Sequence, residues 1–489
     1  MTAHWVRGHQ IDRGTEAAFY AISKQKTGSP LPPEPGWQRI GAIAHVSDLH
    51  ITDTESPARL DFLIQTATDP RFEQNLPTPR PQQLTSSHAA AATLATIQRL
   101  ADQGIVDAAV LTGDLVDNGQ ANEFQMLHNL FTGAEVHPSL NSERLEGTQT
   151  QSWSSAKVWQ PGNRDNYWAS HFGFPADDAL ARALARPFRL TPLTIPTALC
   201  RGNHDALLAG WIPWQEGLAT IATGTTKAHE LPAGYLHDHA AQQLRKDPVQ
   251  FLSGASTSVT PFATRAPLPA SEFPLSFSST LSYREGTDGV LEVTEDLLVM
   301  IIDTSDQRGL PNGVISQEQA SWVQNTLTSI TDTKPTAAVL IASHHGPHDH
   351  PFEPAPGMLT GQETVNLLGQ HGSVLAWLTG HTHRASLKTH AATSGRSIVE
   401  INAASIIDWP CQFQTIQVWK NGDGYRLVVT KQDFDAPTNF EGNWDQPQLA
   451  HLHRCLAANQ ADFGIIFPGL EQLDEDDYAV DVDPFEVTA

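Results

Sequence analysis

Cysteine is scarce in this sequence of 489 residues. The three cysteines, Cys200, Cys411 and Cys455, are widely separated and include no CxxC pair. An odd number of scattered cysteines argues against structural disulfides and against a zinc site built from thiolates. We therefore expect a protein of a reducing compartment.

Long apolar segments are also missing. No stretch approaches the length of a membrane span, and even the apolar run 337–343 is far too short. The N-terminal residues lack the basic start and apolar run that a secretory signal needs. These absences predict a cytoplasmic protein that does not associate with membranes.

Basic residues are outnumbered, with Lys+Arg 30 against Asp+Glu 54 and a formal net charge of -24. Such a surface repels polyanions, which makes nucleic acid an unlikely partner. Part of the acidic excess lies in the run 473–483, which we expect to be a solvated tail. The sequence gives no indication of an oligomeric state.

Short runs of aliphatic residues recur along the chain and predict buried strands. They lie at 41–47, 108–113, 197–202, 297–303, 337–343 and 374–380. None alternates between polar and apolar residues, as expected for strands that are covered on both faces. Helical patterns at 88–104 and 316–330 separate them, and Ser316 with Gln319 matches a capping box. This alternation predicts an α/β sheet with crossover helices.

The later part of the chain has a different pattern. The runs 396–405 and 413–431 predict further strands, and Asn421-Gly422 predicts a hairpin turn within the second run. We divide the chain into an N-terminal extension, a core, and a C-terminal helix with the acidic tail, at 1–38, 39–445 and 446–489. Three segments of the core have the composition of insertions, at 54–87, 120–196 and 206–290.

Polar residues follow five of the predicted strands at the point where each strand ends. The motifs are Asp48-Leu49-His50, Gly113-Asp114-Leu115-Val116-Asp117, Gly202-Asn203-His204-Asp205, Ser343-His344-His345-Gly346 and Gly380-His381-Thr382-His383. The carboxyl ends of strands form one edge of an α/β sheet, and ligands bind at that edge. Each motif alone is weak evidence, but five in succession predict a single site.

Carboxylate, imidazole and amide donors without thiolate suit divalent or trivalent metal ions such as manganese, iron or zinc. Residues two apart on an extended strand end point to the same side, so Asp48 with His50 and His381 with His383 are expected to converge. Two metal ions a few ångströms apart need a bridging carboxylate, for which Asp114 is the natural candidate.

This series of motifs resembles the calcineurin-like metallophosphoesterase superfamily over about residues 40 to 405. The resemblance implies an α/β fold, a four-layer α-β-β-α sandwich of two mixed sheets with helices outside. It also implies two metal ions at the strand carboxyl ends. The first ion would be held by Asp48, His50, Asp114 and His383, and the second by Asp114, Asn203, His344 and His381.

The resemblance also implies the catalytic roles. His204 would contact the phosphate and protonate the leaving oxygen, and Asp117 would orient His204. Asp205 is expected to brace its own turn. His344 is preferred over His345 as a ligand because the family's ligand directly follows the apolar strand.

The activity that the resemblance implies is phosphoester hydrolysis by a metal-bridging hydroxide. Asn118 stands where phosphoprotein phosphatases have an arginine, which weakens that assignment. We expect phosphate monoesters of a small molecule as substrates, with cyclic nucleotides or other small phosphodiesters as the alternative. A metal-free binding module of the same fold is less favoured, because all the ligand positions are filled. A nuclease would need a basic groove, which the sequence does not indicate.

Other residues near the motifs leave alternatives open. Arg80, Arg164 and Arg201 could contact phosphate, although a position on the surface is favoured. The aromatic group from Trp153 to Trp168 could form a lid, but packing of the insertion onto the core is favoured. Asp408 could border the site or simply turn the chain.

Overall fold

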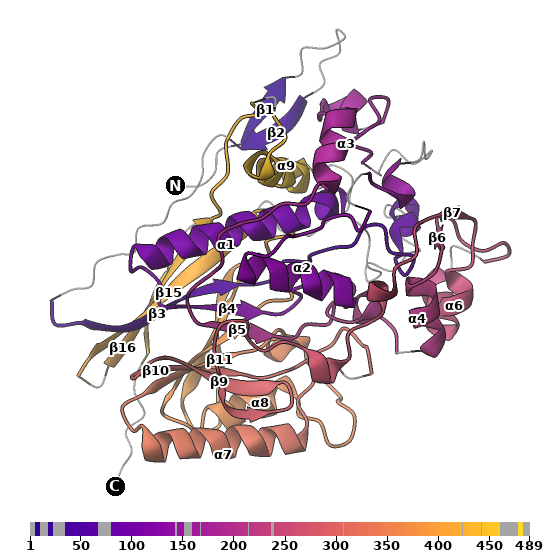
Figure 1. Ribbon diagram of the computed structural model, residues 1–489. Helices are drawn as coiled ribbons and strands as arrows, with labels where there is room; N and C mark the ends of the chain where they lie inside the picture. The colour runs from indigo at the N-terminus through magenta and orange to yellow at the C-terminus, as the bar shows by residue number, and fades with distance from the viewer. Residues whose placement is uncertain are drawn as a thin grey trace.

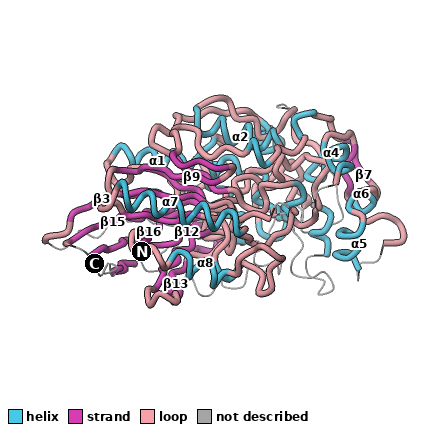
Figure 2. The backbone as a smooth tube through the Cα atoms, turned by 90° about the horizontal axis from the view of Figure 1, so that it is seen from below, coloured by secondary structure: helices cyan, strands magenta, loops and turns pink. Residues whose placement is uncertain are grey.

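The computed structural model describes residues 5–9, 18–22, 35–66, 80–141, 144–150, 159–166, 168–213, 215–235, 239–306, 308–422, 424–441, 443–459 and 478–482. Two large β-sheets lie between groups of helices (Figure 1). Seen from below, the strands of the two large sheets gather at one end, and the segments around α4 (Glu216–Ala222), α5 (Ala240–Lys246) and α6 (Pro248–Phe251) lie at the other (Figure 2).

The first sheet has six strands in the described part of the chain, in the order β17-β16-β15-β3-β4-β5. These strands are β3 (Gln38–Val46), β4 (Ala108–Thr112), β5 (Thr197–Cys200), β15 (Gln412–Asn421), β16 (Gly424–Asp433) and β17 (Tyr478–Val482). Strands β3, β4 and β5 are parallel. Strand β15 is antiparallel to β3 and β16, and β17 is antiparallel to β16.

The second sheet has seven strands among the described residues, in the order β13-β14-β12-β11-β10-β9-β8. They are β8 (Ser282–Glu285), β9 (Asp288–Thr294), β10 (Leu297–Ile301), β11 (Ala338–Ala342), β12 (Val374–Thr379), β13 (Ser386–Ala391) and β14 (Ser397–Asn402). Strands β10, β11, β12 and β14 are parallel, and β9 and β13 run antiparallel to their neighbours. The predicted α/β class with mixed sheets is confirmed.

Alternate residues of a parallel strand pack into different apolar clusters. In β4, Val110 belongs to a cluster that includes Val299 and Leu340 of the second sheet. Its neighbour Leu111 packs instead in a cluster with Ile97 of α1. Both faces of the strand are therefore buried, which explains why its sequence is continuously apolar.

Helices cover the outer faces of both sheets. α1 (Ser86–Asp102) and α2 (Ala121–Thr132) contribute to the cluster against the first sheet. α7 (Gln317–Thr333) and α8 (Gly361–Leu368) contribute to the cluster against the second sheet. The other helices and strands are α3 (Asp178–Ala185), α9 (Gln446–Asn459), β1 (Trp5–His9), β2 (Ala18–Ile22), β6 (Thr226–Ala228) and β7 (Ser256–Ser258). Short helical turns span Asp61–Thr66, Pro81–Thr85, Gly147–Thr150, Trp168–Phe172, Leu207–Gly210, Ala263–Arg265, Ala270–Glu272 and Pro347–Asp349.

The six predicted strands, the two predicted helices and the hairpin at Asn421-Gly422 are all present. Ser316 caps α7, and its hydroxyl accepts a hydrogen bond from the Gln319 backbone N–H at 3.1 Å. The second half of the predicted capping box is wrong. The Gln319 side chain donates instead to the Asp288 carboxylate at 2.9 Å and to the Asp303 carbonyl at 2.8 Å, because these acceptors lie beside the helix start.

Trp159 and Trp168 of the predicted insertion 120–196 are buried in a cluster with Leu452 of α9, so this part of the insertion packs onto the core. Trp153 lies outside the described residues. Residues 478–482 of the predicted tail form β17, and the rest of the run 473–483 lies outside the described residues. The domain boundaries stay predictions. In the ranges that the structure describes, no helix combines the length and apolar character of a membrane span.

Candidate metal centre

Side chains that follow the parallel strands of both sheets meet at one place. Asp114 follows β4 of the first sheet, and its Oδ2 lies 3.3 Å from Nε2 of His344, which follows β11 of the second. Asp48 follows β3, and its Oδ1 lies 3.2 Å from Nε2 of His383, which follows β12. The strand ends of the two sheets therefore converge as expected.

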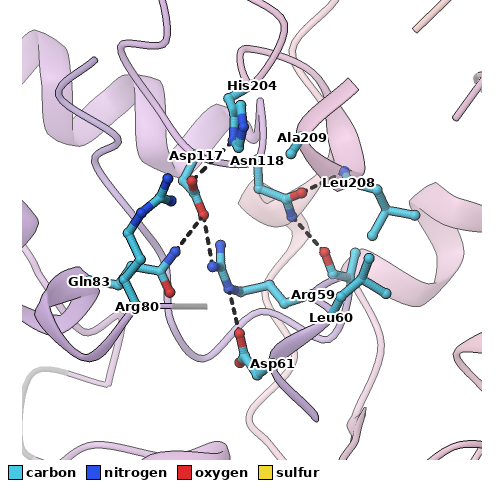
Figure 3. A pocket seen from close by; sticks show the side chains of 11 residues that line it. Arg59, Leu60, Asp61, Arg80, Gln83, Asp117, Asn118, His204, Leu208 and Ala209 are labelled. Atoms are coloured by element: carbon cyan, nitrogen blue, oxygen red, sulfur yellow. Dashed lines mark hydrogen bonds and ion pairs between the residues drawn. The ribbon is translucent and has the colours of Figure 1, made fainter. Parts of the chain in front are cut away.

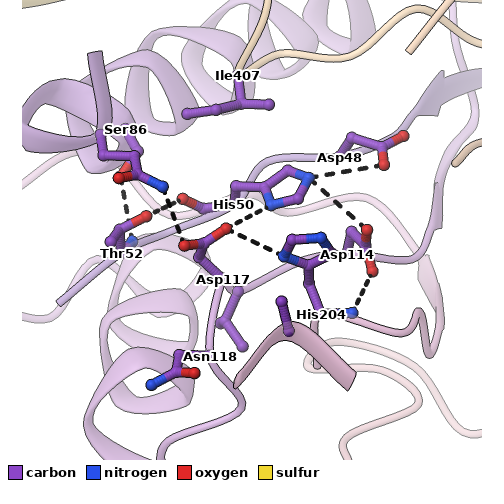
Figure 4. A network of polar contacts seen from close by, with 12 residues as sticks. Asp48, His50, Thr52, Ser86, Asp114, Asp117, Asn118, His204 and Ile407 are labelled. Atoms are coloured by element: carbon purple, nitrogen blue, oxygen red, sulfur yellow. Dashed lines mark hydrogen bonds and ion pairs between the residues drawn. The ribbon is translucent and has the colours of Figure 1, made fainter. Parts of the chain in front are cut away.

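One group of potential ligands consists of Asp48, His50, Asp114 and His383. Their ligand atoms lie within 4.8 Å of one another, and all four residues are buried. Nε2 of His50 is 3.7 Å from Asp48 Oδ1 and 3.7 Å from Asp114 Oδ2 (Figure 4). These four residues are the set predicted for the first metal ion.

A second group contains His344 and His381, together with His345. One ring nitrogen of each lies within 4.8 Å of the others. The ring centroids of His344 and His381 are 5.1 Å apart. His344 also reaches Asp114, so this carboxylate contacts both groups of histidines, as a bridging ligand must.

His345 has both ring nitrogens engaged elsewhere. Nδ1 lies 3.0 Å from the Thr304 hydroxyl. Nε2 lies 3.1 Å from the Pro311 carbonyl oxygen, which can only accept, so Nε2 carries a proton. In His344, Nδ1 donates to the Thr112 carbonyl at 2.7 Å, whereas Nε2 faces Asp114. Although the three histidines lie close together, these bonds favour His344 over His345 as the ligand.

Asn203 presents its carbonyl oxygen in a defined direction. Its Nδ2 donates to the Ala209 carbonyl at 3.1 Å, which fixes the orientation of the amide. The turn at 208–210 that carries this carbonyl is left-handed, with φ of 53° at Leu208 and 57° at Ala209. Asn118 stabilises the turn by accepting a hydrogen bond from the Leu208 N–H at 2.6 Å. Because Nδ2 of Asn203 is engaged in this way, Oδ1 is the amide atom left for a metal ion.

The Nδ1 atoms of three histidines have partners that fix the rings. Nδ1 of His50 lies 2.8 Å from Asp117, and Nδ1 of His383 lies 2.6 Å from Asp408. His344 uses the Thr112 carbonyl in the same way. Metal-binding histidines almost always donate their second nitrogen to a carboxylate or a carbonyl, which leaves the Nε2 lone pair for the metal.

The donor atoms fit a metal site by a further criterion. Among the described residues, buried polar atoms without a hydrogen-bond partner include Asp48 Oδ1, His50 Nε2, Asn203 Oδ1 and His344 Nε2. An unsatisfied buried polar atom is costly, and native structures rarely keep several together without a ligand. Lone pairs of carboxylates and imidazoles that face one another require a positive charge between them. Two metal ions bound by these residues would satisfy them.

The electrostatics of the site favour positive charge. Although burial disfavours the imidazolium, Asp114 and Asp48 raise the pKa of His344 to about 10. Burial likewise opposes protonation of His50, but hydrogen bonds to Asp117 and Asp48 raise its pKa to about 9. Despite burial, the histidines around Asp114 hold the pKa of this carboxyl well below its usual range. Metal binding at these residues would displace protons.

The reason why the paired ligands converge differs from the prediction. Asp48, His50, His381 and His383 have positive φ values of 54°, 45°, 67° and 59°, so these strand ends are not extended. Asp114 also has a positive φ, of 48°. Left-handed backbone costs free energy for residues other than glycine and clusters at functional sites, where the surrounding structure holds it in place. The side chains converge because the backbone turns sharply after each strand.

Glycine is required where the backbone passes under the ligands. Gly113 has a φ of 90°, and a Cβ atom there would lie 2.5 Å from the His344 ring. A Cβ atom at Gly202 would collide with the Asp114 carboxylate. Both glycines therefore allow the backbone to pass close to the ligands.

His204 and Asp117, the predicted catalytic pair, lie beside the first group. Nδ1 of His204 is 3.2 Å from Asp117 Oδ1, and the backbone N–H of His204 donates to Asp114 Oδ1 at 2.8 Å. The His204 side chain is 13% exposed, whereas His50 is fully buried. Burial lowers the pKa of His204, although Asp114 opposes this. Asp117 accepts from both His204 and His50, a double role that the sequence did not indicate.

A narrow pocket of about 30 Å³ opens beside His204 (Figure 3). It is lined by Ala58, Arg59, Leu60, Asp61, Arg80, Gln83, Asp117, Asn118, His204, Leu208 and Ala209. Arg80 reaches Asp408 at 2.9 Å, so one of the three arginines considered from the sequence borders the site. Arg164 is exposed. Arg201 instead donates to the Ser305 hydroxyl at 2.9 Å.

Sequence reasoning missed Arg59 and Gln83 and left Asp408 undecided. Arg59 Nη2 lies 2.7 Å from Asp117 Oδ2, and Gln83 Nε2 donates to the same oxygen at 3.0 Å. Both come from the segment 54–87, which was predicted only as an insertion. Asp408 borders the site through His383 and Arg80. No spacing signal marks these residues, because they reach the motifs only through the fold.

Comparison with known proteins decides the family. The calcineurin-like phosphoesterase family matches residues 41–385, which is more than half of the chain and includes all five motifs. The chain belongs to this family. It is accordingly a metallophosphoesterase, as the sequence predicted. A search of curated proteins gives no match.

Solved structures with similarity to this metallophosphoesterase include a dimetal phosphatase from Danio rerio, with 14% identity and a TM-score of 0.36. That match covers 81% of this chain and 98% of the other. PhoD has 11% identity and a TM-score of 0.29, with coverage of 91% and 81%. GAP50, the anchor in the inner membrane complex of Plasmodium, has 10% identity, a TM-score of 0.28 and coverage of 86% and 96%.

Proposed function

We propose that this metallophosphoesterase hydrolyses phosphate monoesters of a small molecule with two metal ions. The observation that carries the proposal is the position of Asp114. Its carboxylate contacts His50 and His344, which belong to two different histidine groups, and also accepts from the His204 backbone. Manganese, iron, zinc or a mixed pair would suit these donors.

The residues divide into ligands and a catalytic pair. The first ion would be held by Asp48, His50, Asp114 and His383, and the second by Asp114, Asn203, His344 and His381. When bound, the two ions would polarise the phosphoryl oxygens and make a water molecule nucleophilic near neutral pH. His204 lines the pocket and would donate a proton to the leaving oxygen, while Asp117 holds its Nδ1.

The pocket and the charge of the chain support a small-molecule ester as the substrate. The pocket beside His204 would receive the leaving oxygen of the ester, to which the imidazole would donate its proton. The formal net charge of -24 supports a small molecule rather than a nucleic acid.

We also propose that the two sheets and their helices form four layers. The four-layer α-β-β-α sandwich is supported by three apolar clusters. One lies between the sheets, and the other two lie between a sheet and its helices.

The experiment is a substrate panel on protein stripped of metal with a chelator and reloaded with manganese, iron or zinc. Nitrophenyl phosphate, bis-nitrophenyl phosphate and cyclic nucleotides are compared for kcat/KM with each ion. We expect metal-dependent hydrolysis with monoesters preferred. A preference for diesters would contradict the substrate class, and inactivity toward every ester with every ion would contradict the proposed function.

A further inference from the structure

Asp117 is the meeting point of four side chains. Its Oδ1 accepts from Nδ1 of His50 at 2.8 Å and lies 3.2 Å from Nδ1 of His204. Its Oδ2 accepts from Gln83 at 3.0 Å and pairs with Nη2 of Arg59 at 2.7 Å (Figure 3). One oxygen thus serves the two histidines, and the other is held by two residues of the segment 54–87.

A series of buried charges leads from Arg59 away from the site. Nε of Arg59 donates to Asp61 Oδ1 at 3.2 Å, and the other oxygen of Asp61 pairs with the Lys227 ammonium group. The side chains of Arg59 and Lys227 are 6% and 0% exposed. The order Lys227, Asp61, Arg59, Asp117 alternates in sign, so each inner member has an opposite charge on both sides. Residues of two predicted insertions, 54–87 and 206–290, supply the first three.

This series of buried charges restricts the position of Asp117. An arginine held by Asp61 on one side can donate to Asp117 from only one direction, and its planar guanidinium resists rotation. The carboxylate is therefore held with Oδ1 toward the two imidazoles.

We infer that Arg59 is a positioning residue, which acts through Asp117 to fix the rings of both His204 and His50. The inference rests on the proposed function, in which His204 is the acid and His50 a metal ligand. It gives the segment 54–87 a role in the chemistry, because Arg59 of this segment holds both the acid His204 and the ligand His50 in place.

The test compares Arg59→Met with Arg265→Met. Arg265 is a matched control because it is also buried and also pairs with an aspartate, Asp53, at 2.7 Å. In the described part of the chain, Arg265 contacts Asp53, Glu55 and the Thr260 carbonyl, and not Asp117 or a histidine. Both variants lose a buried guanidinium and are expected to lose similar amounts of stability against urea.

Two readouts separate positioning from a merely structural role. Zinc and manganese affinities are measured by calorimetry on metal-free protein. Arg59→Met should weaken binding about 10-fold, the lower end of the effect of losing a direct partner of a ligand, because Arg59 acts on His50 through Asp117. Hydrolysis of phenyl phosphate should fall more than that of nitrophenyl phosphate, because the nitrophenolate group leaves without protonation. Arg265→Met should change neither the affinity nor this ratio. Arg59→Lys should restore part of the metal affinity, because lysine keeps the positive charge but lacks the planar guanidinium with its several N–H donors.

Equal effects of Arg59→Met and Arg265→Met on metal affinity and on the substrate ratio would overturn the inference. If Arg59→Met does not fold, Arg59→Gln takes its place, because it removes the guanidinium that pairs with Asp117 but keeps a polar side chain. Unchanged metal affinity and an unchanged ratio in that variant would overturn the inference equally. Wild-type protein that binds metal but hydrolyses no phosphoester would contradict the proposed function alone, since the metal affinities would still decide the role of Arg59.

Discussion

Asp408 lies 2.6 Å from Nδ1 of His383 and, through the same carboxylate, contacts Arg80 at 2.9 Å. It comes from the segment after β14 and reaches the end of β12 from outside the five motifs. The predicted ligand His383 therefore depends on a residue that the motifs do not include.

Asp408→Asn is expected to weaken metal binding about 10–100-fold while the protein remains folded. The amide is neutral and can no longer hold the Nδ1 proton of His383 as strongly. Metal affinity by calorimetry, with circular dichroism as a check of folding, measures this effect. Asp435→Asn is a control, because Asp435 pairs with Arg99 on the surface. A metal affinity equal to that of the wild type would mean that Asp408 only turns the chain.

Asp114→Asn is expected to do far more damage than Asp205→Asn. The first disturbs the contacts with both histidine groups, whereas Asp205 accepts from the backbone N–H groups of Gly202 at 2.8 Å and Val116 at 2.9 Å. Loss of a bridging ligand should remove several kcal/mol of transition-state stabilisation, or about 10³-fold in turnover. Metal content and turnover are measured for both variants. Similar losses in the two would show that the bridge is misassigned.

His344→Ala and His345→Ala discriminate between the two adjacent histidines. His344→Ala should reduce the metal content from two ions toward one, because its Nε2 faces Asp114. His345→Ala should retain both ions, since its ring nitrogens bond to Thr304 and Pro311. Elemental analysis after gel filtration measures the metal content. Retention of both ions by His344→Ala together with loss by His345→Ala would reverse the assignment.

His204→Ala is expected to keep both metal ions and to lose about 10²–10⁴-fold in rate, typical of removing a general acid. The loss should shrink for nitrophenyl phosphate, whose leaving group needs no proton. The comparison is kcat for phenyl and nitrophenyl phosphate, together with metal content. An equal loss for both esters, or the loss of an ion, would argue for an electrostatic or structural role instead.

Stability should fall as pH rises because of Asp288, at the start of β9. Burial raises its pKa from 3.8 to about 7, although the Asp303 N–H and Gln319 donate to it. Because the folded-state pKa is the higher one, the contribution to stability is full below pH 3.8 and is lost as pH rises through about 7. Asp288→Asn should make this slope shallower and raise the free energy of unfolding by at least ~1 kcal/mol at pH 8. Urea unfolding at several pH values measures it, and an unchanged slope would contradict the prediction.

The strands and the metal ligands could be predicted from the sequence because both follow local rules. Each ligand stands directly after an apolar run, so the position of Asp114 or His344 follows once the strand is recognised. The partners of these ligands could not be predicted. Arg59 reaches Asp117 only through the folding of the insertion around it, and no spacing in the sequence specifies which arginine does so. Gln319 shows the same limit, because a tertiary acceptor, Asp288, replaced the local partner that the capping pattern implied.

The order of strands in the first sheet constrains how the chain acquires its structure during synthesis. β3 lies between β4 and β15, and β15 is translated only after the last of the five motifs. A nascent chain that already carries every ligand still has one edge of β3 without a neighbour. Such an edge is open to pairing with other chains. Codons that slow translation between the last motif and β15 are therefore expected to increase aggregation, whatever metal is supplied.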